Sequence, residues 1–175
     1  YLTIKEKFTK RGLIKYRLEI PNLEIQFSLN DFFIDVLTTQ RSEKLRIQDN
    51  LYDALVEGNL EELQRILIAL FASIPYNNFT NNQIANYEGY YASVLYAYFA
   101  SLGFEIIAED TTNKSRIDLT LKLEDKAYIF EFKVTNSDGK AALQQIKEKN
   151  YAQKYQSYPT IYLVGIDFST TERNI

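Results

Sequence analysis

The chain has 175 residues, a formal net charge of −3, and no histidine, cysteine or methionine. Its length is enough for one domain with a buried core, with or without an appendage. Without cysteine there can be no disulfide framework and no thiolate metal site. Without histidine there can be no serine–histidine triad, no usual zinc site and no histidine general base. Any catalysis must therefore rely on Asp, Glu, Lys, Tyr or a metal ion bound through oxygen.

Three further features bear on location and partners. No apolar run approaches the roughly 20 residues of a membrane-spanning helix, and the lack of cysteine suits a cytoplasmic protein. The chain begins at Tyr1 rather than methionine, so we interpret it as a piece of a longer protein. Basic residues gather over residues 5–17 and 140–154, where they could meet phosphates or form solvated faces.

The N-terminal segment predicts a pair of strands followed by a helix. The strands are expected over residues 2–4 and 13–20, and Pro21-Asn22 is a turn signal after the second. Asn30 is expected to cap a helix over residues 31–38, because acidic residues occupy its first turn. The polar stretch that follows is the expected domain boundary.

Helical periodicity dominates the middle of the chain. Apolar residues recur at helical spacing from Glu43 to Ser73, apart from an interruption at Gly58-Asn59. Asn59 followed by Glu62 resembles a capping box, which predicts that a second helix begins there. A third helix is expected from residue 80 or 81 to about 102.

The C-terminal part predicts a sheet with helices around it. Strands are expected over residues 104–108, 117–123, 127–134 and 160–168, with a helix over 141–155. A helix before the last strand implies a crossover connection, so the sheet should be mixed. We therefore expect an α/β fold with helices on both faces of a central sheet and a helical extension before it.

Two strands joined by a turn near Asp125 bring acids and a lysine together. Asp118 lies on the first strand, and Glu131 and Lys133 share one face of the second because side chains alternate. If Asp118 faces the same side, the two carboxylates can share a Mg²⁺ ion, with the Phe132 carbonyl as a further oxygen ligand. Such an ion polarises a phosphate and lowers the pKa of bound water, while lysine offsets charge in the transition state.

A solvated strand face is the competing interpretation, because Glu-x-Lys is common on exposed strands. Asp118 argues against it, since aspartate is a poor strand former and this one lies between Ile117 and Leu119 in an apolar run. Two adjacent carboxylates also repel each other when no metal is bound. The arrangement would therefore be costly for a purely structural hairpin.

The order helix, three strands, helix, strand, with Asp on the second strand and Glu-x-Lys on the third, resembles the PD-(D/E)XK nuclease superfamily. This resemblance covers roughly residues 45–175 and implies a restriction-endonuclease-like core. The chain is more specifically similar to a bacterial branch in which the nuclease-like domain follows an AAA-ATPase-like domain. The segments that carry this likeness are Tyr87–Tyr91, Arg116–Asp118, Tyr128–Lys133, and Ala142–Ile146 with Tyr151 and Tyr155.

The resemblance also implies a division of the chain. Residues 1–40 are similar to the tail of the ATPase-like region, which leaves residues 41–175 as the nuclease-like domain. No Walker sequence is present, so the nucleotide site of such an ATPase is not in this piece. Ser115 departs from the branch, which commonly has glycine before Arg-Ile-Asp.

Each matching residue acquires an implied role. Asp118 and Glu131 match the metal-binding acids, Lys133 the catalytic lysine, and Glu88 an acid that many members add to the metal site. The implied substrate-binding residues are Gln145, Tyr151 and Arg116. An ordinary surface position for Glu88, and helix packing for the glutamine and tyrosine, remain the alternatives.

We therefore predict a metal-dependent nuclease that hydrolyses phosphodiester bonds, with DNA as the expected substrate and Mg²⁺ or Mn²⁺ as the cofactor. The basic residues over 140–154 would follow the nucleic-acid backbone. Two alternatives stay open: a nuclease-like fold that binds nucleic acid without cutting it, and a protein-interaction domain for an ATPase-like partner. The sequence leaves open endo- or exo-action and the oligomeric state, a dimer included.

Overall fold

A four-stranded mixed sheet forms the centre of the molecule. The computed structural model describes residues 1–39, 42–75, 88–135, 140–172 and 174–175. The sheet has the order β3-β4-β5-β6, and its strands are β3 (Glu105–Thr111), β4 (Arg116–Lys122), β5 (Lys126–Thr135) and β6 (Thr160–Ser169). The first three strands pair antiparallel, and β6 joins β5 in parallel. The mixed sheet predicted from the crossover is thus confirmed.

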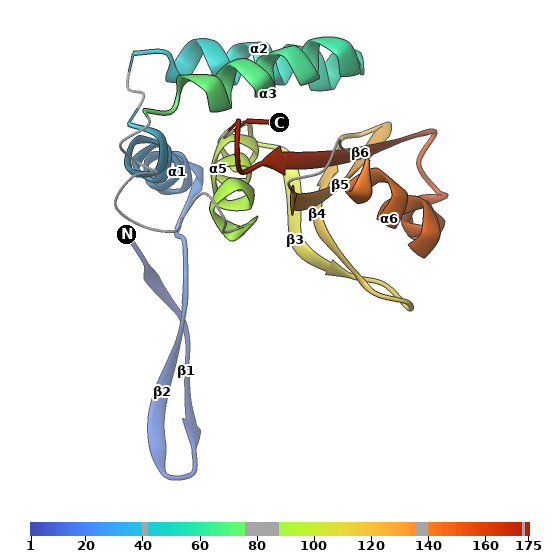
Figure 1. The fold of residues 1–175 in the computed structure, drawn as a ribbon. Coiled ribbons are helices and arrows are strands. Elements are labelled where there is room, and N and C mark those ends of the chain that lie inside the picture. Colours follow the sequence, from blue (N-terminus) through green and yellow to red (C-terminus); the bar gives the residue numbers. More distant parts are fainter. Residues whose placement is uncertain (40–41, 76–87, 136–139, 173) are drawn as a thin grey trace.

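Helices cover both faces of this sheet, as predicted for an α/β fold (Figure 1). Helix α5 (Glu88–Ser101) packs on the face that carries Leu119, Leu121 and Phe130. Helix α6 (Ala141–Lys149) lies on the other face, followed by a short 3₁₀ helix, Tyr151–Tyr155. The single helix expected over 141–155 is therefore interrupted, because Asn150 takes a left-handed conformation with φ 53° that ends α6.

Two further helices, α2 (Lys44–Glu57) and α3 (Leu60–Ser73), lie side by side beyond the α5 face of the sheet (Figure 1). Gly58 reverses the chain between them with φ 76°. The Asn59 side chain accepts the backbone N–H of Glu62 at 3.0 Å, which confirms the predicted cap of α3. Tyr128 connects this layer to the sheet, since its hydroxyl donates to the carbonyl of Leu55 at 2.7 Å.

The predicted start of the first helix is wrong. Helix α1 spans Leu23–Thr38, and the Asn22 side chain caps it by accepting the backbone N–H of Ile25 at 2.9 Å. Asn30 therefore lies in the middle of α1, because the asparagine after Pro21 already supplies the cap. Helix α1 then packs against α5, where the Tyr90 hydroxyl donates to the Leu37 carbonyl at 2.9 Å.

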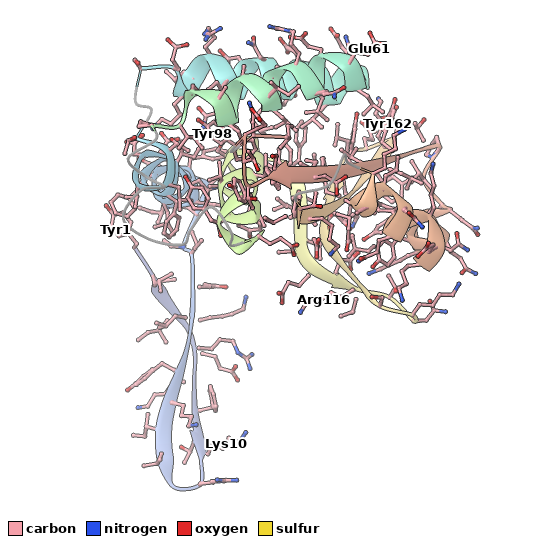
Figure 2. The ribbon with its side chains drawn as sticks, in the orientation of Figure 1. Tyr1, Lys10, Glu61, Tyr98, Arg116 and Tyr162 are labelled. Carbon is pink, nitrogen blue, oxygen red and sulfur yellow. The ribbon has the colours of Figure 1, made fainter. Side chains whose placement is uncertain are left out.

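Strands β1 (Thr3–Lys10) and β2 (Leu13–Glu19) form a two-stranded ribbon that projects away from the rest of the molecule (Figure 1). Lys10 lies near its far end (Figure 2). In the part of the chain that the structure describes, no helix has the length and apolar character needed to cross a membrane. The predicted helix start at residue 80 or 81 lies outside the described residues, and the division at residue 40 stays a prediction.

Candidate active site

Asp118 lies where β4 separates from β5. The pairing of these strands runs from Lys122–Ala127 to Leu119–Phe130. Beyond it, the Oδ2 atom of Asp118 accepts the backbone N–H of Phe132 at 2.9 Å. In a continuing ladder, the backbone N–H of Phe132 would donate to a backbone carbonyl. Here it donates to the side-chain carboxylate of Asp118 instead.

This separation changes the direction of the Asp118 side chain. Strict alternation along β4 would put Asp118 and Leu119 on opposite faces of the sheet. Instead both residues line one cavity, while Ile117 and Thr120 face the side covered by α6 and the 3₁₀ helix. Asp118 therefore opens toward the α5 side at the edge of the paired region.

Glu131 is almost completely buried, with 1% of its surface exposed. Its Oε1 atom accepts a hydrogen bond from the side-chain amide of Gln145 on α6 and lies 3.6 Å from the Lys133 ammonium nitrogen. Its Oε2 atom is buried and has no hydrogen-bond partner in the described structure. One oxygen of the carboxylate is thus held in place, and the other is left without a partner in the described structure.

Burial raises the pKa of Glu131 to about 7, and the negative charge of Asp118 adds to this effect. The Lys133 ammonium and the Asp118 backbone act in the opposite direction but do not cancel it. An ionised Glu131 therefore lacks sufficient positive charge around it. The two acids do not share one face as the shared-metal prediction required, since Glu131 contacts α6 and Asp118 opens toward α5, but the charge of Asp118 still acts on Glu131. The unpartnered oxygen of Glu131 fits a hard divalent cation, which binds through oxygen and would supply the missing positive charge.

Close packing of α6 against β6 brings Gln145 to Glu131. Gly165 is the neighbour of Glu131 in the parallel β5–β6 register. A Cβ atom at Gly165 would lie 2.2 Å from the backbone nitrogen of Leu143, so a side chain here would displace the helix. The sequence signal for this contact was a glycine inside an apolar strand, which often marks close backbone approach.

Asp167 fixes the beginning of α6 from the same strand. Its Oδ2 atom accepts the backbone N–H of Lys140 at 2.7 Å, and its Oδ1 atom accepts that of Ala142 at 3.2 Å. Sequence reasoning missed this residue, although an aspartate in an apolar strand was the same kind of signal as Asp118. Asp167 thereby helps to orient the helix that carries Gln145.

A cavity of about 750 Å³ lies beside Asp118, between α1, α5 and the adjoining ends of β3 and β4. Glu88 lines it from the start of α5, and Arg116 lines it from the start of β4. Arg116 also pairs with Glu109 at 3.3 Å. Among the described residues, no three acidic side chains come close enough to form one metal site. The auxiliary metal-binding role of Glu88 stays a prediction.

Tyr151 is buried behind this region. Its hydroxyl donates to the backbone carbonyl of Arg116 at 3.0 Å, so the 3₁₀ helix supports the beginning of β4. Figure 2 shows Arg116 at the lower edge of the sheet, where β4 pairs with the end of β3. The implied substrate-binding residues thus differ in position, since Arg116 lines the cavity and Tyr151 lies beneath it.

A second buried carboxylate lies on the α6 side of the sheet. Asp110 accepts hydrogen bonds from Lys154, Tyr155 and Thr120. Burial acts to raise the pKa of Asp110, but these donors outweigh it and hold the pKa below its usual value. Lys154 was expected to follow a nucleic-acid backbone, and the structure instead pairs it with this internal acid.

Comparisons with known proteins agree with this architecture. Residues 86–175 match the model of the PD-(D/E)XK nuclease superfamily. A protein from Azotobacter chroococcum mcd 1, described as an uncharacterized protein in the vnfD 5′ region, is 41% identical over 177 aligned residues. This alignment includes 100% of the chain but only 34% of that relative, so the chain spans about a third of its length. No solved structure gives a significant match.

The matched segment runs from just before α5 to the last residue of the chain. It contains the whole four-stranded sheet and the three residues Asp118, Glu131 and Lys133. The family match agrees with the strand order and with the positions of these residues. The chain belongs to the PD-(D/E)XK nuclease superfamily.

Proposed function

We propose that this chain is a metal-dependent nuclease domain that hydrolyses phosphodiester bonds in DNA at Asp118, Glu131 and Lys133. The observation that carries the proposal is the buried Oε2 atom of Glu131, which has no hydrogen-bond partner in the described structure and belongs to a carboxyl whose pKa the charge of Asp118 helps to raise. A carboxylate in this environment requires either a proton or a nearby cation. The superfamily makes a nuclease the natural context for that cation.

The proposed metal ligands are the carboxylates of Asp118 and Glu131 and the backbone carbonyl of Phe132, with Glu88 assisting from α5. Mg²⁺ or Mn²⁺ is the expected ion, because every proposed ligand is an oxygen and the chain contains no histidine or cysteine. When bound, the ion would polarise the phosphate and lower the pKa of a bound water.

Gln145 and Lys133 have distinct proposed roles beside these acids. Gln145 donates to Oε1 of Glu131 and thereby fixes the carboxylate, which would leave Oε2 for the ion. The Lys133 side chain is partly exposed and lies 3.6 Å from Glu131, so its ammonium can also reach a substrate phosphate. There it would offset the negative charge that develops during hydrolysis.

The projecting ribbon supports a nucleic-acid substrate. Residues 1–20 contain six basic and two acidic residues, although the whole chain has a net charge of −3. An exposed basic ribbon would attract phosphates, and the resulting binding would weaken as salt increases. The resemblance of residues 1–40 to the tail of an ATPase-like region supports a further proposal, that such a domain accompanies this one in the parent protein.

Cleavage of DNA tests the proposed function. The wild-type chain and the Lys133→Ala variant are incubated with supercoiled plasmid and with single-stranded DNA, in Mg²⁺, Mn²⁺ or EDTA. Arg65→Ala, at an exposed basic residue on α3 outside both basic groups, is the control. We expect metal-dependent cutting that is lost in Lys133→Ala and retained in the control. Folded wild-type protein that cuts neither substrate with either metal would favour the binding or interaction alternatives.

A further inference from the structure

The cavity beside Asp118 has walls unlike those of a phosphate site. Most of its lining is apolar, and its volume of about 750 Å³ falls within the usual range of ligand pockets, roughly 300–1,000 Å³. The acids Glu88, Glu109 and Asp118 also line it. Arg116 is the basic residue among the described lining residues, and it is already paired with Glu109. A phosphate inside this cavity would therefore lose its hydration and be repelled by the carboxylates. A neutral ring carries no charge for them to repel.

Two aromatic side chains add surfaces on which such a ring could stack. Phe33 of α1 and Tyr96 of α5 both line the cavity and remain 45% and 40% exposed. Stacking of nucleic-acid bases on aromatic side chains is a common mode of single-strand recognition, because every base has a flat π face. The two residues come from different helices, so the walls they contribute depend on the packing of α1 against α5.

Asn30 supplies an unpartnered hydrogen-bond donor in the same wall. It lies in the middle of α1, is 8% exposed and lines the cavity. Its Nδ2 atom is buried and has no hydrogen-bond partner in the described structure. A buried donor without a partner destabilises the protein, and asparagine is also a poor residue for a helix interior. Because Nδ2 itself is covered, the side chain would have to rotate toward the cavity for an acceptor on a bound molecule to satisfy this amide.

We propose that this cavity takes up an unstacked base of a single-stranded nucleic acid, with Asn30 donating a hydrogen bond to a carbonyl oxygen or ring nitrogen of that base. The inference rests on the proposed function, because Asp118 lines the same cavity and would lie beside the backbone of the bound nucleotide. A base in an intact duplex is stacked and paired, and it would first have to leave the helix. The domain should therefore prefer single-stranded or frayed substrates.

Binding of labelled DNA tests this inference without requiring cleavage. Fluorescence anisotropy in EDTA measures the affinity for a short 5′-labelled oligodeoxythymidine and for the same strand annealed to its complement. The variants are Asn30→Leu, which removes the amide at similar size, and Phe33→Leu, which removes an aromatic wall. Phe27→Leu is the matched control, because Phe27 is partly exposed on the same helix and is not part of the cavity lining.

We expect the wild-type chain to bind the single strand more tightly than the duplex. Asn30→Leu and Phe33→Leu should each weaken single-strand binding about tenfold, while Phe27→Leu should leave it unchanged. Asn30→Leu should also keep or raise the melting temperature, since it removes an unpartnered buried donor. A purely structural role for Asn30 predicts the reverse, a lower melting temperature with unchanged affinity.

The failure of this inference can be distinguished from the failure of the nuclease proposal. Equal affinity for single strand and duplex, no binding by the wild-type chain, or unchanged affinity in both variants would overturn the base-binding cavity. Metal-dependent cleavage in the same preparation would then leave the proposed nuclease intact. Selective single-strand binding without cleavage would support the cavity and contradict the nuclease.

Discussion

Replacing Glu131 by glutamine should stabilise the metal-free chain at high pH. Burial and the charge of Asp118 raise the pKa of Glu131 from 4.5 to about 7. The folded protein therefore binds this proton more tightly than the unfolded chain does. The corresponding stability is fully present below pH 4.5 and is lost as the pH rises through 7. The difference amounts to about 3 kcal/mol for a fully buried group.

Glutamine keeps the shape of the side chain and an oxygen that can accept from Gln145, but it carries no charge. In EDTA, Glu131→Gln and wild type should have similar free energies of unfolding near pH 4.5. At pH 8 the variant should be more stable by about 3 kcal/mol, which corresponds to roughly 6–12 °C in melting temperature for a chain of this size. Urea unfolding followed by circular dichroism measures the free energy of unfolding at each of the two pH values.

Glu61→Gln is the matched control, because Glu61 is exposed on α3 and lies far from the site (Figure 2). It should not reproduce the pH-dependent difference. If Glu131→Gln changed stability equally at both pH values, or destabilised the chain at pH 8, the described environment of Glu131 would be incorrect.

Three further outcomes follow from particular contacts. Gly165→Ala should lower the free energy of unfolding by about 1–3 kcal/mol or more, because the new Cβ would meet the backbone of Leu143. Urea unfolding measures this loss, and an unchanged midpoint would contradict the close approach of α6. Asn59→Ala should cost about 1 kcal/mol in thermal unfolding through the lost cap of α3, and a neutral result would mean that this hydrogen bond adds little. Mn²⁺ should raise the melting temperature of wild type but not of Asp118→Asn; an equal rise in both would place the ion elsewhere.

Local patterns were sufficient to predict much of the sheet and the strands on which the candidate residues lie. The turn that joins β4 and β5 is short, and Leu123 donates to the carbonyl of Lys126 at 2.9 Å. A tight turn fixes the register of two apolar strands, so the sequence alone could bring Asp118 near Glu131. It could not reveal that β4 leaves its partner at Asp118, because that departure depends on a bond from the side chain to the backbone of Phe132.

Contacts between distant segments were harder to predict. Asn22 and Asn30 both precede plausible helical segments, and the choice between them depends on how the helix packs against α5. The position of Asn30 in a cavity wall was invisible for the same reason. The resemblance pointed to Gln145, but its hydrogen bond to Glu131 requires the close packing of α6 that Gly165 permits.

Binding of Mn²⁺ tests most directly whether Asp118 and Glu131 form one metal site. Electron paramagnetic resonance of free Mn²⁺ gives the affinity of the wild-type chain and of the Asp118→Asn and Glu131→Gln variants at one pH and salt concentration, without dependence on turnover. Glu61→Gln again serves as the control. The account predicts that wild type and control bind the ion equally well and that each site variant binds it much more weakly. Unchanged affinity in both site variants, or no binding by the folded wild-type chain, would contradict the proposed site.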